Sequence, residues 1–351
     1  MDVLSEVLRV VRFSGAIHFC AEFTRPWAIR TSPPEMLVGR LVPGAEAVIP
    51  FHIATAGRCL LSWGQVQPIP IEAGDVVVFA RGAQHTLASE PDVTPVPIGS
   101  IYRPSPDQIT ILRHGGGGDE CRFVCGFLHS DQRFGPLLDA MPSLTCARVR
   151  DGVLMLEAYS DIGRYAEPVT LDQDPKWWTA AIAHLVNETA KPGPGNRAVL
   201  SRLSELLFME LVRWQLSHIS DGRSGWLAGL NDKNVGRAIS LLHAQPARAW
   251  TVDELAQQAG ISRAALAKRF VELVGETPMQ YLAEWRMHLA RRQLRESMLG
   301  LSEIAARVGY ESEAAFSRAF RRLVGVPPAT WRETSLNSLE ASAGTTVRTG
   351  Q

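Results

Sequence analysis

The pattern of hydrophobic and polar positions changes at about residue 174. Before that point, short β-branched and aromatic runs alternate with turns containing Gly or Pro, which predicts an antiparallel sandwich or small β-barrel. After it, hydrophobic residues recur at helical spacing. The fold class expected is therefore α+β, with the sheet first and the helices last. The predicted strands are Val38–Val42, Ala47–Ile53, Arg58–Trp63, Asp75–Phe79, Ile109–Leu112 and Arg122–Leu128.

Two helices are predicted before the last third of the chain. Pro175–Ala190 ends at a Pro/Gly stretch over 191–195. Asn196–Ile219 carries a leucine stripe, which suits either an ordinary packed helix or a dimerisation surface. From these boundaries we expect a β domain at 1–150, a helical linker at 151–226, an all-α domain at 227–334 and a disordered tail at 335–351.

An internal repeat dominates the last hundred residues, and each copy encodes a short helix, a tight turn and a longer helix. This order is that of a helix-turn-helix unit. Because the copies keep a fixed offset, we expect two such units in one all-α domain. The matching positions of the two copies are Phe270 and Phe320, Gly275 and Gly325, and Pro278 and Pro328.

Capping residues mark the helix ends within the repeat. Thr251 and Glu254 form a capping box that begins the first short helix. Gly260 is suited to the left-handed backbone that ends it. Ser262 and Ser312 are suited to the N-caps of the two longer helices.

The longer helices have one face free to read DNA. Leu266 with Phe270 and Phe316 with Phe320 are spaced to face inward. The opposite face holds small and cationic side chains, as a helix in the major groove requires. The candidate DNA-binding residues are Arg263, Ala264, Ala267 and Lys268 on the first helix and Glu313, Ala314, Ser317, Arg318 and Arg321 on the second.

Pro278–Glu296 is predicted to be a continuous helix that connects the two units, with Pro278 in its first turn. At about 1.5 Å per residue it is roughly 28 Å long, close to the pitch of about 34 Å of B-DNA. A rigid connector of this length places two reading helices in successive major grooves. Arg286, Arg291, Arg292 and Arg295 lie on or near it and could contact phosphates or pair internally.

Charge supports this assignment weakly. The whole chain has 36 Lys and Arg against 36 Asp and Glu, but residues 226–335 contain 15 against 11. A mildly basic C-terminal segment is compatible with phosphate binding. The chain shows no apolar run long enough to span a bilayer and no signal-peptide pattern at its start, so we expect a cytoplasmic protein.

The repeat resembles the DNA-binding domain of the AraC/XylS family over about 227–332. The resemblance implies promoter binding, contact with RNA polymerase and, usually, activation of transcription. It also places the DNA contacts on the candidate residues given above. Ala264 and Ala267 stand where larger polar residues are common, so the first unit is expected to read fewer base edges. The motifs that carry the likeness are Trp250–Ala256, Phe270, Gly275–Pro278, Arg286, Ile304–Ala305, Val308–Tyr310, Phe316, Arg318–Phe320 and Gly325–Pro328.

The segment Gly74–His85 resembles the second cupin motif, and Phe51–His52 lies near the place of the first. The His-x-His and the following Glu of metal-binding cupins are missing, and Ala80 replaces the usual proline. We therefore expect a cupin-like β-barrel without complete enzymatic metal chemistry. The whole region 2–144 is similar to the cupin-type sensor of one AraC subfamily.

Three interpretations of the histidines and cysteines stay open. His52 and His85 could be hydrogen-bonded core residues beside space-filling thiols. They could line an effector pocket with Trp27, Phe51, Trp63 and Phe79. They could also join Cys125, with Cys20 or Cys59, in a metal or thiol-redox site. The candidate effector or metal residues are His52, His85, Cys125 and Cys20.

The sequence indicates a transcription regulator and not an enzyme. Its expected partners are promoter DNA, RNA polymerase and a small-molecule, metal or redox effector, with a homodimer possible and no membrane. No cofactor is assigned, and zinc or another metal in the cupin domain stays open. The main alternative is a cupin oxygenase or isomerase with an appended DNA-binding module. A DNA-repair protein with an alkyl-accepting cysteine would need a four-cysteine zinc cluster, and these five cysteines are too scattered for one.

Overall fold

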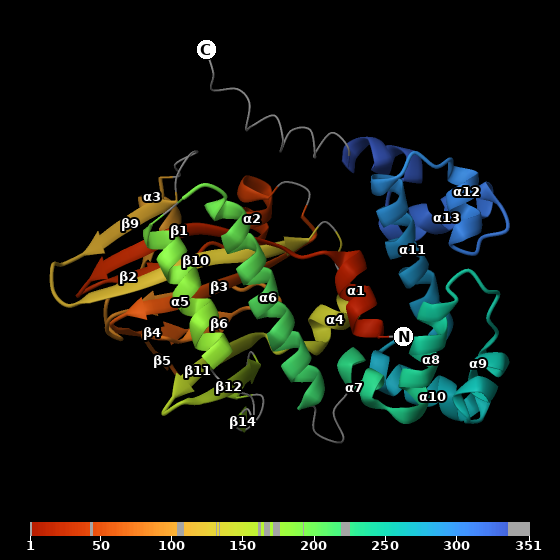
Figure 1. Ribbon diagram of the computed structural model, residues 1–351, viewed down its shortest axis with the longest axis horizontal. Helices are drawn as coiled ribbons and strands as arrows, with labels where there is room; N and C mark the ends of the chain where they lie inside the picture. The colour runs from red at the N-terminus through yellow and green to blue at the C-terminus, as the bar shows by residue number, and fades with distance from the viewer. Residues whose placement is uncertain are drawn as a thin grey trace, which may run out of the picture. The chain divides into compact units, whose positions relative to one another are not determined.

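The computed structural model describes residues 2–42, 45–103, 109–130, 132, 134–160, 163–164, 169–170, 176–191, 193–218 and 225–335. The chain forms two compact units. The sheet unit consists of Phe13–Arg133 and Met141–Trp214. The helical unit consists of Met1–Arg12, Phe134–Ala140 and Gln215–Gln351. Figure 1 shows the strands gathered in the one and a group of helices around α11 in the other.

The sheet unit is built on a large, mainly antiparallel sheet and a smaller one. The large sheet has the order β13-β12-β11-β6-β3-β10-β1-β9, with β14 beside β12, and the smaller has the order β5-β4-β7-β2-β8. Strands of the large sheet are β1 (Ser14–Thr24), β3 (Ala47–Ala56), β6 (Val76–Val78), β9 (Thr110–Gly115), β10 (Glu120–Ser130), β11 (Leu144–Arg150), β12 (Val153–Ser160), β13 (Gly163–Arg164) and β14 (Val169–Thr170). Strands of the smaller sheet are β2 (Ala28–Arg30), β4 (Arg58–Ser62), β5 (Ile69–Glu72), β7 (Thr86–Ala88) and β8 (Val96–Pro97).

One strand prediction is wrong. Val38–Val42 was expected to be extended, but it overlaps helix α2 (Pro34–Leu41). Pro34 at the first helical position favours the helix start, and a short apolar run alone does not distinguish helix from strand. The other predicted strands overlap β3, β4, β6, β9 and β10.

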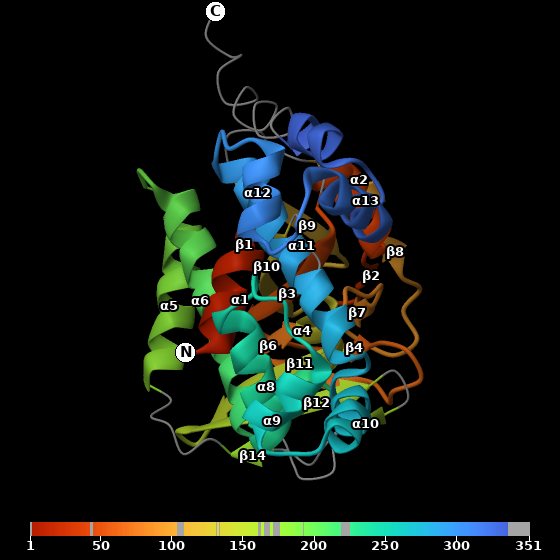
Figure 2. The ribbon, with the colours of Figure 1, turned by 90° about the vertical axis from the view of Figure 1, so that its right-hand side faces the viewer.

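Two long helices cover the large sheet. The predicted helices are confirmed as α5 (Lys176–Ala190) and α6 (Asn196–Ser217), which run side by side in Figures 1 and 2. Gly15 on β1 allows α6 to approach closely, because a Cβ there would lie 2.7 Å from the Ser201 carbonyl oxygen. The sheet unit also contains the short helix α3 (Ile98–Ile101).

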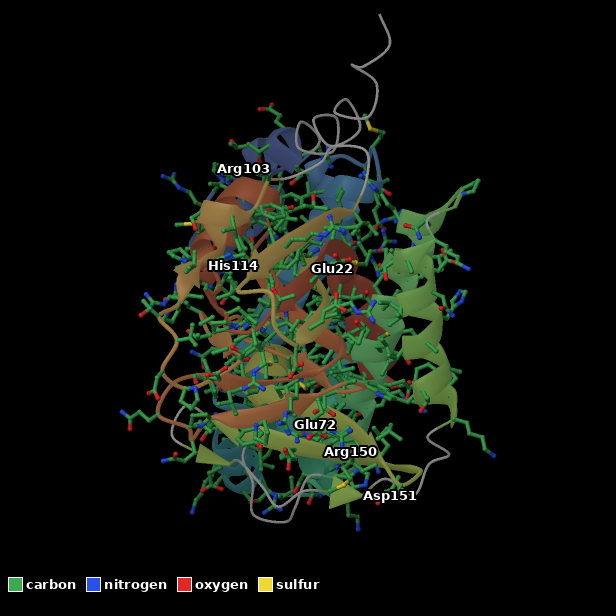
Figure 3. All side chains as sticks on the ribbon, turned by 90° about the vertical axis from the view of Figure 1, so that its left-hand side faces the viewer. Glu22, Glu72, Arg103, His114, Arg150 and Asp151 are labelled. Carbon is green, nitrogen blue, oxygen red and sulfur yellow. The ribbon has the colours of Figure 1, made fainter. Side chains whose placement is uncertain are left out.

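A buried carboxylate anchors the turn before β6. Asp75 is fully buried, and its Oδ1 lies 2.6 Å from Nη2 of Arg150 on β11. The same guanidinium nitrogen lies 3.4 Å from Oε2 of Glu72 on β5. Figure 3 labels Glu72 and Arg150, which lie near each other at one end of the sheets. This ion pair fixes the strand that leads toward His85.

The helical unit contains the expected repeat and two segments from earlier in the chain. The connector predicted at Pro278–Glu296 is confirmed as α11 with those bounds. The repeat helices are α9 (Val252–Ala259) and α10 (Arg263–Val274), followed after α11 by α12 (Leu301–Arg307) and α13 (Glu313–Val324). The remaining helices are α1 (Val3–Val11), α4 (Gly135–Ala140), α7 (Trp226–Asn231) and α8 (Lys233–Ala244).

Phe134 fills an aromatic cluster in the helical unit. It is buried, and its ring centroid lies 5.3 Å from that of Trp226 and 6.0 Å from that of Trp285. No sequence pattern indicates that this residue, which lies between two sheet segments, belongs to the core of the helical unit.

A chain of hydrogen bonds joins α1 to the same core. Trp226 Nε1–H donates to the Tyr281 hydroxyl over 2.9 Å, and that hydroxyl lies 2.7 Å from His243 Nε2. His243 Nδ1 lies 3.1 Å from a carboxylate oxygen of Glu6. Because a carboxylate only accepts, His243 donates through Nδ1 and accepts the tyrosine proton at Nε2. Burial lowers the pKa of His243, which agrees with a neutral ring.

The strand β12 lies within 151–226, the segment expected to be a helical linker, and pairs with β11. The tail expected at 335–351 lies beyond Ser335 outside the described residues. None of the described helices is both long enough and apolar enough to cross a lipid bilayer.

Candidate functional site

The helix-turn-helix units fold as their capping residues predict. Thr251 and Glu254 form a capping box at the start of α9, and Gly260 ends that helix with a left-handed backbone, φ 74°. The Ser262 and Ser312 side chains accept hydrogen bonds from the backbone N–H groups of Ala265 and Ala315 at the starts of α10 and α13. These caps fix where each longer helix begins and therefore which side chains face outward.

The candidate DNA-binding residues lie on the free faces of α10 and α13. The inward residues Leu266, Phe270, Phe316 and Phe320 are completely buried. None of the candidates is buried. Exposed are Arg263, Ala264 and Lys268 on α10 and Glu313, Ala314, Arg318 and Arg321 on α13, while Ala267 and Ser317 are half-buried.

The cations of α10 are paired with acidic side chains of the same unit. Arg263 lies 3.2 Å from Asp253, and Lys268 lies 3.8 Å from Glu272 one turn later. Arg269 lies 2.6 Å from Asp232, the residue that caps α8. The first two pairs are well exposed, so each contributes little to stability and a phosphate can displace the acid.

The arginines of α13 differ. Within the described part of the chain, Arg318, Arg321 and Arg322 form no ion pair, and all three are exposed. The positive charge of α13 is therefore directly available to a polyanion.

The connector arginines have internal roles. Arg286 donates to the carbonyl oxygens of Pro246 and Arg248 over 2.7 and 2.9 Å. Arg291 is buried, with its guanidinium 5.2 Å from the centroid of the Trp331 ring. The sequence left open whether the connector arginines contact phosphates or groups within the protein. Arg286 and Arg291 make internal contacts.

In the sheet unit, His52, His85 and Cys125 come together. Cys125 on β10 lies opposite His52 on β3 in the strand register. The Cys125 thiol lies 3.0 Å from His52 Nδ1, and His52 Nε2 lies 2.8 Å from His85 Nε2. The Phe79 ring stacks on His85 with centroids 4.0 Å apart.

Hydrogen-bond chemistry fixes the direction of this chain. His85 Nδ1 lies 2.8 Å from the Ala83 carbonyl oxygen, which only accepts, so Nδ1 carries a proton. In the neutral ring, His85 Nε2 then accepts from His52 Nε2–H, and His52 Nδ1 accepts from the Cys125 S–H. The result is a closed, uncharged series from the thiol through both imidazoles to a carbonyl.

The pKa shifts agree with this assignment. Burial lowers the pKa of His85 to about 4 and also lowers that of His52, with the neighbouring His85 contributing to the latter. Burial raises the pKa of the Cys125 thiol. All three groups are therefore neutral at pH 7.

The cluster does not fit a metal ion. Cys125 lies at Nδ1 of His52, whereas His85 lies at Nε2. Because these two nitrogen atoms are on different sides of the His52 ring, a single ion could not be bound by all three side chains. No group of three or more His, Cys, Asp or Glu side chains among the described residues is arranged to hold a metal. Cys20 does not join the cluster. It pairs with Val124, next to Cys125, so that its side chain points to the opposite face of the sheet.

A largely apolar cavity of about 120 Å³, partly open to solvent, adjoins the two histidines. Trp27, Phe51, Trp63 and Phe79 were expected to line such a pocket and do not. Trp27, Trp63 and Phe79 lie in the hydrophobic core between the sheets, and Phe51, next to His52 in the strand, points to the other face. The apolar walls instead include Phe19, Met36, Leu37, Ile98, Tyr102 and Phe127.

Comparisons with known proteins cover both units. A family described as Cupin matches residues 2–159 and 167–217, and one described as Helix-turn-helix domain matches residues 255–334. A putative AraC-like transcription regulator of Streptomyces lividans is 32% identical over 334 residues, covering 95% of this chain and 98% of the relative. The HTH-type transcriptional regulator AlkR of Acinetobacter baylyi is 35% identical over 338 residues, covering 95% of this chain and 100% of the relative.

Among solved structures, the DNA-binding domain of AdpA in complex with a target DNA has 31% sequence identity with this chain. The match covers 29% of this chain and 92% of the AdpA chain, with a TM-score of 0.28.

A cupin domain followed by two capped helix-turn-helix units defines a DNA-binding regulator of transcription. The chain belongs to the AraC family of transcription regulators, as its full-length relatives establish. The family resemblance inferred from the repeat is thereby confirmed.

Proposed function

We propose that the cupin domain senses a small, uncharged and largely apolar effector, whose binding changes the affinity of α10 and α13 for promoter DNA. The observation that carries this proposal is the neutral series Cys125–His52–His85 beside an apolar cavity. An effector acts on DNA affinity only if it binds one arrangement of the chain better than another.

The charge state of the cavity selects the effector class. His52 and His85 are neutral and already engaged in hydrogen bonds, so the cavity offers no counter-ion among its lining residues. A charged ligand would lose hydration without gaining a partner, which costs far more than burying an apolar group. An uncharged ligand with one polar group can bury its apolar part and exchange a hydrogen bond with an imidazole.

Three probes with one carbon skeleton test this selection: 2-phenylethanol, phenylacetate and 2-phenylethylammonium. Calorimetric titration of the full-length protein is expected to show binding of the alcohol alone. Ala83→Phe, which fills the cavity from its wall, is expected to abolish that binding while DNA affinity stays unchanged. Binding of a charged probe with equal affinity, or of no probe at all, would contradict the proposal.

The route from the cavity to the helical unit follows the chain. The strand β10 carries Cys125 and ends at Ser130, and Phe134 follows shortly after as part of the helical core. The paired strand β1 begins at Ser14, directly after α1, which belongs to the helical unit. A shift of these two strands thus acts on segments that pack within the DNA-binding unit.

Cys125→Ser tests this route at its origin. We expect it to change the transcriptional response in a reporter assay without changing basal DNA affinity. An unchanged response, with alcohol binding intact, would remove Cys125 from the route.

The redox and enzymatic alternatives have less support. Burial raises the pKa of the Cys125 thiol, and a hydrogen bond with Cys121 together with burial raises that of Cys59, which disfavours the reactive thiolate at both positions. The histidine arrangement does not fit a catalytic metal, and the full-length relatives are transcription regulators. We therefore infer a regulator without catalytic activity, which metal analysis and turnover assays would check.

Partner proteins complete the proposal. We infer that the regulator activates transcription by contacting RNA polymerase and that it forms a homodimer through the outer face of α5 and α6. Trp177 is 44% exposed and Leu206 is 37% exposed on these helices, although both side chains are large and apolar. Leu206→Glu is expected to shift the molar mass measured by light scattering from dimer to monomer, and a wild-type monomer would contradict dimerisation.

A further inference from the structure

The second helix-turn-helix unit touches the first at a glycine. Gly309, in the turn between α12 and α13, has a φ of 84°. A Cβ built on it would lie 2.6 Å from the carbonyl oxygen and 2.7 Å from the Cα of Ala247, which follows α8. Real Cβ atoms do not come so close to backbone, so only glycine permits this approach.

Arg286, on the connector helix α11, contacts both sides of this junction between Gly309 and Ala247. Its guanidinium donates to the carbonyl oxygens of Pro246 and Arg248, on either side of Ala247. The guanidinium carbon also lies 5.6 Å from the centroid of the Tyr310 ring, next to Gly309. One side chain on α11 therefore bridges the loop of the first unit and the turn of the second.

The first unit has no such contact at the matching position. Gly260 is the equivalent turn glycine of the first copy, although it lies one position out of the repeat's offset. In both turns the residue after the glycine donates to the helix carbonyl five positions earlier, and the φ of Gly260, 74°, is similar. A Cβ on Gly260 would meet nothing within 4 Å. The first turn thus needs glycine only for its backbone angle, whereas the second needs it for the angle and for space.

We propose that Gly309 and Arg286 are positioning residues that fix the separation and rotation of α10 and α13, and thereby the spacing of the two half-sites in the operator. The helix α11 sets a length, and its packing against α12 and α13, with Arg291 over the Trp331 ring, holds the second unit on the connector. The contact at Ala247 ties the second unit directly to the first and so fixes how the two are rotated. The inference rests on DNA reading by both α10 and α13.

The test compares Gly309→Ala with Gly260→Ala in the full-length protein. Both substitutions strain a left-handed backbone to a similar degree, but only the first forces the junction apart. An operator is first selected from randomised duplexes with the wild-type protein, and a footprint over two successive major grooves establishes reading by both units. Affinity is then measured on this operator and on versions with one base pair added or removed between the half-sites. Each such change shifts the second half-site by about 3.4 Å and about a tenth of a turn.

The wild type and Gly260→Ala are expected to discriminate between native and altered spacing by about tenfold or more, equivalent to about 1.4 kcal/mol. Gly309→Ala is expected to bind all three spacings within about threefold of one another. Arg286→Lys keeps the positive charge and loses the planar guanidinium group. We expect it to lower the ratio of affinities for native and altered spacing, as Gly309→Ala does, and it replaces Gly309→Ala in the test if that variant does not fold.

Two results would overturn the inference. Equal loss of affinity on all spacings in both glycine variants would reduce Gly309 to a turn residue. A wild-type protein indifferent to spacing, with both half-sites footprinted, would show that the junction does not set the register. A footprint over one groove only would instead overturn reading by both units.

Discussion

The two helix-turn-helix units share a framework and differ on their surfaces. Each reading helix begins at a serine cap and ends at a left-handed glycine, Gly275 or Gly325. Each carries a completely buried phenylalanine at the same repeat position, Phe270 or Phe320. On α10 the cations are engaged with acids of their own unit, whereas those of α13 have no acidic partner in the part of the chain that the structure describes.

This difference shows which properties a duplication keeps. Caps, turn glycines and core aromatics specify the same fold twice, so a change in either copy is costly. Exposed charges contribute little to folding, so they are free to diverge. We infer that the second unit supplies most of the electrostatic attraction to DNA and that the first contributes mainly shape and register.

The largest predicted effect tests the shared framework. Phe270→Ala and Phe320→Ala should each lower the free energy of unfolding by about 3–5 kcal/mol, because both remove a fully buried ring. Urea denaturation would measure the loss, with Leu323→Ala as a control at a 40% exposed position expected within about 0.5 kcal/mol of wild type. A loss confined to one of the two phenylalanine variants would break the equivalence of the units.

Arg318→Ala should have the next largest effect. Among the described residues its charge has no acidic partner, so removing it loses only the proposed DNA contact, and we expect specific binding to weaken by about 1–3 kcal/mol. Mobility-shift titration on the selected operator would measure this. Arg237→Ala removes one exposed charge from α8 and should change affinity far less. Equal effects of the two variants would mean that only net charge matters.

Lys268→Ala should weaken binding less than Arg318→Ala, by about 1 kcal/mol. The lysine gives up its pair with Glu272 when it meets a phosphate, which offsets part of the gain. The slope of log affinity against log salt should fall by about one in this variant if the contact is to a phosphate. A loss as large as that of Arg318→Ala would contradict the assignment of the weaker role to α10.

The framework was predictable from the sequence because its determinants are local. Thr251, Gly260, Ser262 and Pro278 act within one turn of their own position, and all four have the predicted structure. In the sheet unit, the cluster of His52, His85 and Cys125 was anticipated only as one of three alternatives, since residue types alone do not fix the register that brings them together.

Contacts between distant segments could not be predicted in the same way. Phe134 joins the core of the helical unit although sheet strands precede and follow it, and no local pattern marks that placement. The two turn glycines are equivalent in sequence, and only the proximity of Ala247 distinguishes Gly309 from Gly260. Two of the acidic partners of the α10 cations also come from other segments, namely Asp232 at the N-cap of α8 and Asp253 on α9.

The smallest predicted effect is a gain in DNA affinity, whereas the other substitutions are expected to lower affinity or stability. Asp253→Asn removes the acid that lies 3.2 Å from Arg263 while keeping the side-chain shape, so the arginine of α10 becomes as available as those of α13. DNA affinity should rise by about 0.5 kcal/mol at low salt, because an exposed pair is worth about that much, and the gain should vanish at high salt. Asp253→Asn combined with Arg263→Ala is the control, and the gain should be absent there. A gain that persists in the double variant would show that Asp253 repels DNA directly and that pairing does not restrain the first unit.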